Sequence, residues 1–181
     1  MIDFKYLSMG LNALARAHHM TSMAGHLGAS LIAGYFIGEQ RPDLDPEVKK
    51  GIESDLDRIM SGSSIFGTKM LKKPKLTDSE LFESFPKQKP DNSLIDDLAE
   101  TLAKNITKTR QSGHNVIFAS LAIRALREHP EFATPDVVNG IRQLIELFDG
   151  QHPGSGYYGK KRGRITGNRI KLPQDDKTPL Y

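Results

Sequence analysis

The sequence contains no cysteine and no tryptophan. Without cysteine the chain cannot form disulfides, thiolate metal ligands or a cysteine nucleophile. Zero cysteine is typical of cytosolic proteins, although secreted bacterial proteins can share it. The first ten residues also show no basic segment followed by an apolar one, so no secretory signal is predicted. We therefore expect a cytoplasmic protein.

Long apolar runs are scarce as well. Residues 20–38 contain no Asp, Glu, Lys or Arg, and this stretch is close to the length needed to cross a bilayer. It contains three Ser or Thr side chains, one histidine and four glycines, which make a poor membrane span. Gly34 and Gly38 form a GxxxG pattern, which also allows helices to pack closely in soluble proteins. The pattern predicts a buried helix and no membrane partner.

Positive charge is concentrated near the C-terminus. Segment 151–181 holds seven Lys or Arg and two Asp, which gives +5. Residues 1–150 hold the other 18 basic and 20 acidic residues, which gives −2. The basic isoelectric point is therefore a property of this terminal segment, and the rest of the chain is nearly neutral.

Apolar residues recur at three- and four-residue steps through most of the chain, which is typical of helices. No segment alternates with a period of two, so no sheet is predicted, and the fold class is all-α. Asp45 followed by Pro46 marks one helix start, and Thr77 with Glu80 forms a capping box at another. The predicted helical segments are 4–23, 24–40, 46–62, a short helix after Thr77, 91–110, 113–128 and a last one from Thr134.

The chain also shows an internal repeat. With an offset of 88 residues, Gly25-His26 aligns with Gly113-His114, and Pro42 with Pro130. One further residue in the second turn then aligns Gly51 with Gly140. The pattern predicts two tandem three-helix units in one domain, packed as α/α-hairpins or part of a toroid, because one unit cannot bury its own apolar face. The units are repeat 1 (4–61), a connection (62–91) and repeat 2 (92–150), with a basic, glycine-rich loop or tail at 151–181.

The two Gly-His steps, each before a helix rich in small residues, resemble the inner helices of α/α-toroid proteins. Terpenoid cyclases and lanthionine-cyclase-like proteins belong to this class. The resemblance implies that the ends of the inner helices line a central pocket. It implies no activity, because the sequence has no aspartate-rich cyclase motif and no cysteine for a lanthionine-cyclase zinc site.

His26 and His114 are repeat-equivalent and are expected to face a shared axis. His19 lies seven residues before His26 and would share its face on a continuous helix. Three neutral imidazoles could hold a divalent metal or act as acid and base, but each could equally bond a backbone carbonyl in the core. His129, in a Glu-His-Pro turn, is expected to be exposed. The repeat-equivalent Glu39 and Glu128 are expected to cap their helices or face water.

Four cations of the terminal segment form the candidate anion site: Lys160, Lys161, Arg162 and Arg164. Two tyrosines and several glycines lie beside them. This composition fits a solvated loop, a loop that binds an anionic small molecule such as a phosphate or carboxylate compound, or a nucleic-acid site in which tyrosines stack on bases.

Three functions follow from these patterns. The first is a histidine-lined pocket between the repeats that binds a metal or a small ligand. The second is a helical module without chemistry that associates with copies of itself. The third is nucleic-acid binding through the basic segment. No motif identifies a reaction, so the sequence leaves open whether the chain is an enzyme.

Overall fold

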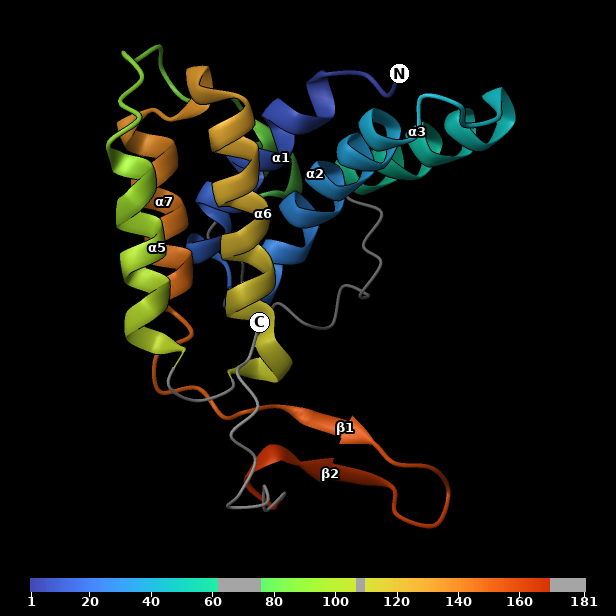
Figure 1. Ribbon diagram of the computed structural model, residues 1–181, viewed down its shortest axis with the longest axis vertical. Helices are drawn as coiled ribbons and strands as arrows, with labels where there is room; N and C mark the ends of the chain where they lie inside the picture. The colour runs from blue at the N-terminus through green and yellow to red at the C-terminus, as the bar shows by residue number, and fades with distance from the viewer. Residues whose placement is uncertain (62–75, 107–109, 170–181) are drawn as a thin grey trace.

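The computed structural model describes residues 1–61, 76–106 and 110–169, and in them it is mostly helical, as predicted. Residues 62–75 of the predicted connection 62–91 lie outside the described residues. Figure 1 shows a body of packed helices with a small hairpin beside it. The elements are α1 (Lys5–Arg16), α2 (Gly25–Gln40), α3 (Pro46–Met60), α4 (Asp78–Phe82), α5 (Leu94–Asn105), α6 (His114–Glu128), α7 (Pro135–Glu146), β1 (Ser155–Tyr157) and β2 (Arg164–Thr166).

The local signals at helix starts act as the sequence predicts. The Asp45 carboxylate accepts a hydrogen bond of 2.8 Å from the Glu47 backbone N–H, and Pro46 occupies the first turn of α3. The capping box at α4 is complete, since the Thr77 side chain accepts from the Glu80 N–H and the Glu80 carboxylate accepts from the Thr77 N–H.

Helix α1 lies at the centre of the body, between α2 and α7 (Figure 1). Its Leu7, Leu11 and Leu14 are completely buried. Two glycines allow the backbones to approach closely. A Cβ atom at Gly28 of α2 would lie 2.5 Å from the Leu14 nitrogen, and one at Gly140 of α7 would lie 2.3 Å from the Ala15 carbonyl oxygen. The first and last helices of the body are thus in direct backbone contact.

The ranges 4–61 and 92–150 each contain three α-helices in the predicted order, but the packing of these helices differs. Helix α7 packs against α1 and α5, whereas α3 packs mainly on α2. The two Gly-His steps differ too. Gly25 has right-handed helical angles and faces the Phe118 ring, while Gly113 has a φ of +87° and open space beside it. The repeat and its toroid-like packing therefore remain predictions, and the two glycines do not share one environment.

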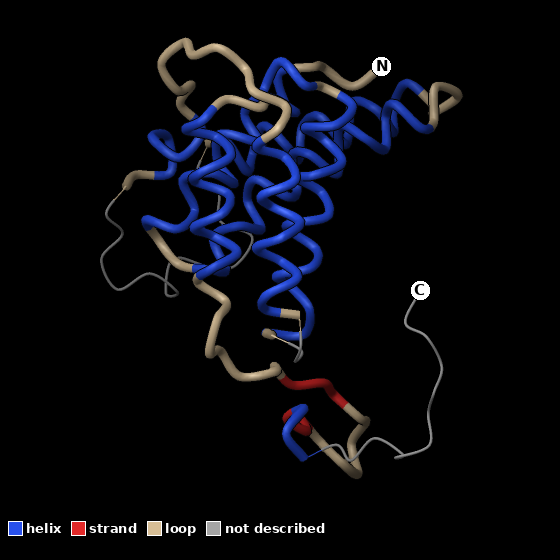
Figure 2. The backbone as a smooth tube through the Cα atoms, turned by 60° about the vertical axis from the view of Figure 1, so that its left-hand side comes forward, coloured by secondary structure: helices blue, strands red, loops and turns tan. Residues whose placement is uncertain are grey.

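The prediction of no sheet is wrong in one place. Strands β1 and β2 pair antiparallel within the basic segment, with Ser155 opposite Thr166 and Tyr157 opposite Arg164. Figure 2 shows this hairpin set apart from the helices. In the rest of the described chain the regular elements are helices. None of the described helices is both long and apolar enough to pass through a bilayer.

Candidate functional site

The residues that carry the sequence hypotheses gather at one end of the body. Helices α2 and α6 lie side by side and run in the same direction, so that both begin on the side of the hairpin (Figure 1). His26 and His114 lie in the first turns of these two helices. The basic hairpin follows α7 and returns to the same end.

The base of the hairpin is fastened to the turn that precedes α6. The Gln111 N–H donates to the His152 carbonyl at 2.9 Å, and the Ser112 N–H donates to the Pro153 carbonyl at 2.8 Å. Arg110 adds a hydrogen bond of 3.1 Å from its guanidinium to the Gln151 carbonyl. The hairpin is therefore held directly beside the start of α6.

The tip of the hairpin is closed by glycines. Gly159 and Gly163 have φ angles of +83° and +63°, which glycine adopts without the strain other residues meet. The Tyr158 N–H donates to the Gly163 carbonyl at 2.8 Å, and the Gly163 N–H donates to the Gly159 carbonyl at 2.8 Å. These bonds define a turn that displays the basic residues 160–162.

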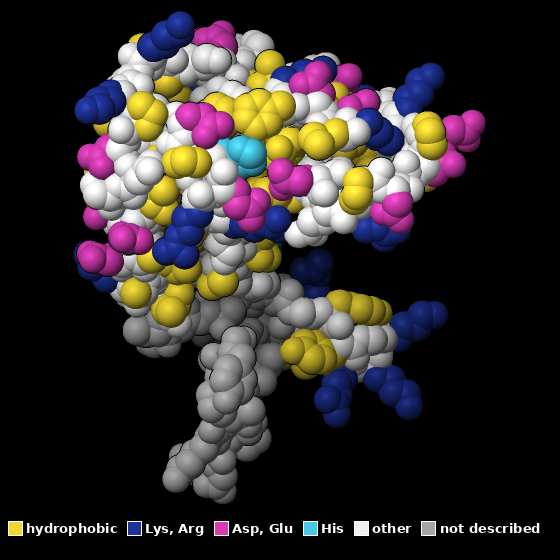
Figure 3. All heavy atoms as spheres, turned by 45° about the horizontal axis from the view of Figure 1, so that its top comes forward, with side chains coloured by type: hydrophobic (Ala, Val, Ile, Leu, Met, Phe, Trp, Pro, Cys, Tyr) yellow, Lys and Arg dark blue, Asp and Glu magenta, His cyan; other side chains and the backbone are white. Residues whose placement is uncertain are grey.

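The hairpin cations are exposed and have no carboxylate partner among the described residues. Tyr157 and Tyr158 are exposed beside them, at 65% and 46%. In Figure 3 the hairpin stands apart from the body and carries Lys or Arg and hydrophobic side chains on the visible face. The cations are Lys160, Lys161, Arg162 and Arg164. Within the described part of the chain, Arg164 is the one whose side chain donates a hydrogen bond, to the Ser155 hydroxyl at 3.1 Å.

The structure brings together His26 and His114, two of the three histidines of the predicted site. Their ring centroids lie 4.6 Å apart, and both rings pack against Phe118. The His26 Nδ1 lies 2.8 Å from the Met23 carbonyl oxygen, and the His114 Nδ1 makes the same contact to the Gln111 carbonyl. Since a carbonyl can only accept, each Nδ1 is the donor in these contacts.

His19 does not join this pair. Helix α1 ends at Arg16, and two short 3-10 turns separate it from α2, so the continuous helix assumed for His19 and His26 does not exist. The exposed His19 ring stacks instead on His18, at 3.8 Å between centroids. His18 Nδ1 in turn contacts the Ala15 carbonyl oxygen at 2.7 Å. The predicted set of three histidines is therefore reduced to a pair.

Burial lowers the pKa of His26 below its usual value of 6.5, and the neighbouring His114 lowers it further, against the opposing effect of the Met23 carbonyl. The unfolded chain then binds this proton more readily than the folded one. The contribution of neutral His26 to folding is therefore complete above the unfolded pKa and is lost as the pH falls below it.

We expect the free energy of unfolding to fall as the pH is lowered from about 7 to about 5, where histidines take up protons. His26→Gln should reduce this pH dependence, because glutamine does not titrate. Urea denaturation across the pH series measures it. His19→Gln, at an exposed ring, is the matched control, and an equal effect of both substitutions would contradict the expectation.

The C-terminal ends of α2 and α6 hold residues that the sequence predicted to be exposed to solvent. The His129 side chain is only 17% exposed, because the Phe4 and Tyr35 rings lie against it at 5.3 and 5.7 Å. Its Nε2 lies 3.9 Å from a Glu39 carboxylate oxygen. The expectation of an exposed turn histidine is thus wrong. The one feature of the sequence that pointed to this end of the helices was the predicted alignment of Glu39 with Glu128.

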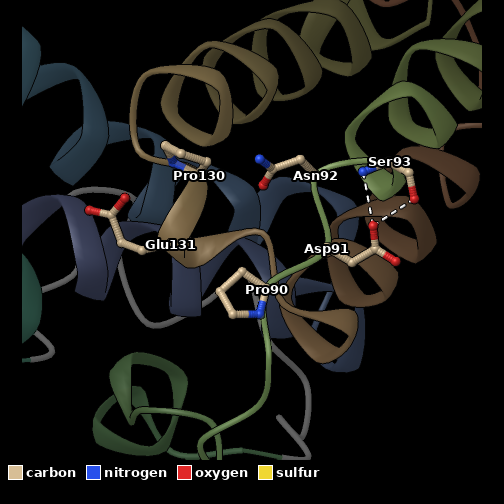
Figure 4. Close-up of a pocket in the computed structure, with 6 residues that line it drawn as sticks. All are labelled: Pro90, Asp91, Asn92, Ser93, Pro130 and Glu131. Atoms are coloured by element: carbon tan, nitrogen blue, oxygen red, sulfur yellow. Dashed lines mark hydrogen bonds between the residues drawn. The ribbon is translucent and has the colours of Figure 1, made fainter.

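An open depression lies between the start of α5 and the turn after α6. Figure 4 shows its lining residues. The Asp91 carboxylate turns away to accept hydrogen bonds from the Ser93 N–H and hydroxyl, at 3.0 and 2.6 Å. The described residues that line it include no Lys or Arg and do include two carboxylates, which disfavour an anion. The lining residues are Pro90, Asp91, Asn92, Ser93, Pro130 and Glu131.

The chain was compared with models of protein families, with curated proteins and with solved structures, and it matches none of them. The resemblance to α/α-toroid proteins therefore gains no support from these comparisons. What the chain can bind follows from the geometry of its own residues.

Proposed function

We propose that the chain binds single-stranded nucleic acid through its basic hairpin. The observation that carries this proposal is the set of exposed hairpin cations without carboxylate partners among the described residues. Such cations release counterions when they meet phosphates, which drives binding. Cations already paired with carboxylates, such as Arg142 with Glu146 at 2.7 Å, gain much less from a phosphate.

The two exposed tyrosines favour a single strand over other polyanions. Aromatic rings beside cations can stack on unpaired bases, and stacking of this kind accepts any base. A duplex would offer its phosphates but would keep its bases stacked on one another. Tyr157 and Tyr158 directly precede the basic turn, so one strand can contact rings and cations together.

The attachment of the hairpin supports the same function. Its base is bonded to residues 111–112, so its cations are presented from an anchored position. The partial positive charge of the α2 and α6 N-termini lies at the same end of the body. These features add favourable potential for a polyanion, while the hairpin supplies the direct contacts.

Replacing Lys160, Lys161 and Arg162 by glutamine should weaken binding of a fluorescent oligothymidylate and make it less dependent on salt. Each lost phosphate contact lowers the slope of log affinity against log salt by about 0.7, so three lower it by about 2. Fluorescence anisotropy over a series of salt concentrations measures this slope. Tyr157→Ala with Tyr158→Ala should weaken affinity by about tenfold or more, with little change in slope.

A matched control changes the same charge elsewhere. Lys50, Lys89 and Lys104 are exposed on the helical body, and their replacement by glutamine should leave the slope nearly unchanged. Equal effects of the two triple variants would contradict the proposal. So would binding to anionic lipid vesicles with no binding to the oligonucleotide.

The other two functions remain predictions. The anchored Nδ1 atoms of His26 and His114 suit a metal or small-ligand pocket, since metal-binding histidines commonly donate their second N–H to a carbonyl. Only two of the three expected histidines meet, however, so the hairpin is the better-supported site. Self-association and a cytoplasmic location are likewise predictions for which the structure offers no test.

A further inference from the structure

The C-terminal ends of α2 and α6 bring together three side chains that can ligate a metal. Glu39, Glu128 and His129 each offer one ligand atom, and these atoms lie within 4.8 Å of one another. Glu39 belongs to the first half of the chain, and the other two belong to the second. The cluster therefore joins segments that are distant in sequence.

The imidazole in this cluster has an unused ligand atom. His129 Nε2 is buried from solvent and makes no hydrogen bond among the described residues. A buried polar atom without a partner is costly, and it is uncommon in folded proteins. The nearest carboxylate oxygen, from Glu39, is 3.9 Å away, which is too far for a hydrogen bond. An ion between them would give His129 Nε2 the partner that it lacks among the described residues.

The surroundings concentrate negative potential at this point. Two helices end here, each with the partial negative charge of its C-terminus. Tyr35 is buried and donates a hydrogen bond of 3.1 Å to Glu39, which holds that carboxylate in place.

One cation partly offsets these charges. The Arg124 guanidinium donates to the Glu128 carboxylate at 2.8 Å and stacks over the Phe36 ring at 3.8 Å. It leaves Glu39 and His129 without a cation of their own among the described residues. Glu128 can keep Arg124 on one lone pair and offer another, because a carboxylate has about four acceptor positions.

We propose that Glu39, Glu128 and His129 bind a divalent first-row transition metal ion, with Zn²⁺ as the type. One imidazole nitrogen with two carboxylate oxygens suits such an ion better than Ca²⁺ or Mg²⁺, which prefer oxygen alone. Binding here links the ends of α2 and α6. This site is separate from the hairpin and from His26 and His114, which lie at the other end of the same helices.

The test is a Zn²⁺ titration of the full chain against a chromophoric chelator, without nucleic acid. We expect one ion per chain, and we expect Glu39→Gln and His129→Gln each to weaken binding by about tenfold or more, as even outer-shell losses commonly do. Zn²⁺ should raise the melting temperature of the unmodified protein more than that of either variant. Co²⁺ in place of Zn²⁺ should give visible absorption bands that both variants lose.

His26→Ala with His114→Ala is the matched control, because it removes the other close histidine pair and leaves this cluster intact. It should bind Zn²⁺ like the unmodified chain. Circular dichroism identifies any variant that fails to fold, and Glu128→Gln then replaces it. Unchanged affinity in the cluster variants, loss of the ion in the control alone, or no saturable binding would each overturn the proposal.

Discussion

Gly140→Ala is expected to destabilise the protein by about 1–3 kcal/mol, the usual cost of overpacking a close contact. The added methyl would lie 2.3 Å from the Ala15 carbonyl oxygen, which belongs to backbone and cannot rotate away. Helices α1 and α7 would have to separate. The higher helix propensity of alanine recovers only part of this loss. Urea denaturation measures the change in the free energy of unfolding.

Gly51 provides the control, since the sequence repeat aligns it with Gly140. It is exposed on α3, and a Cβ atom there would meet nothing within 4 Å. Gly51→Ala should therefore stabilise the protein by about 0.5–1 kcal/mol through helix propensity alone. Two equivalent positions would then respond with opposite signs. Stabilisation by both substitutions would show that α7 does not press on α1 as described.

Phe118→Ala is expected to cost about 3–5 kcal/mol, the range for removing a buried aromatic ring. Phe118 is 1% exposed and contacts His26, His114 and Phe148. Its loss should also free the paired imidazoles, which would appear as changed histidine ring signals in NMR spectra. Thermal or urea unfolding gives the stability change.

Ile117→Ala is the control for Phe118→Ala, because Ile117 is adjacent on α6 but 48% exposed, and its change should be small. Gly25→Ala adds a second check. Its methyl would lie 2.6 Å from the Phe118 ring, so its cost should shrink when Phe118 is already alanine. Additive costs for the double variant would contradict the contact.

The sequence predicted those parts of the fold that depend on neighbouring residues. Asp45 with Pro46, and Thr77 with Glu80, act within one helical turn, so their pattern is visible in the chain itself. The hairpin was missed because its strands have only three residues each, too few to show alternation. The glycines around these strands form turns that allow the strands to pair. Hydrophobic periodicity does not reveal such turns.

For the candidate sites, too, the sequence predicted the local features and missed the contacts between distant residues. Both Gly-His steps and the run of cations were visible in the sequence, and the structure brings the two histidines together. The burial of His129 was not visible in the sequence, since the rings that contact it, Phe4 and Tyr35, come from a distant part of the chain. The prediction that His19 lies beside His26 was wrong because no sequence pattern near Met20 indicates that α1 ends at Arg16. The burial of His129 and the position of His19 both depend on contacts or helix ends that a local sequence pattern does not show.

The direct contact of α1 with α7 also has a consequence for the order in which the protein folds. Helix α1 is synthesised before α7, and one of its faces is covered only when α7 has been made. A helical protein usually folds fast because most of its contacts are local in sequence. The contact between α1 and α7 is non-local, because it joins the first and last helices of the body. We expect it to fold more slowly than helical bundles of similar size, and nascent chains that stop before Pro135 to keep the apolar surface of α1 exposed.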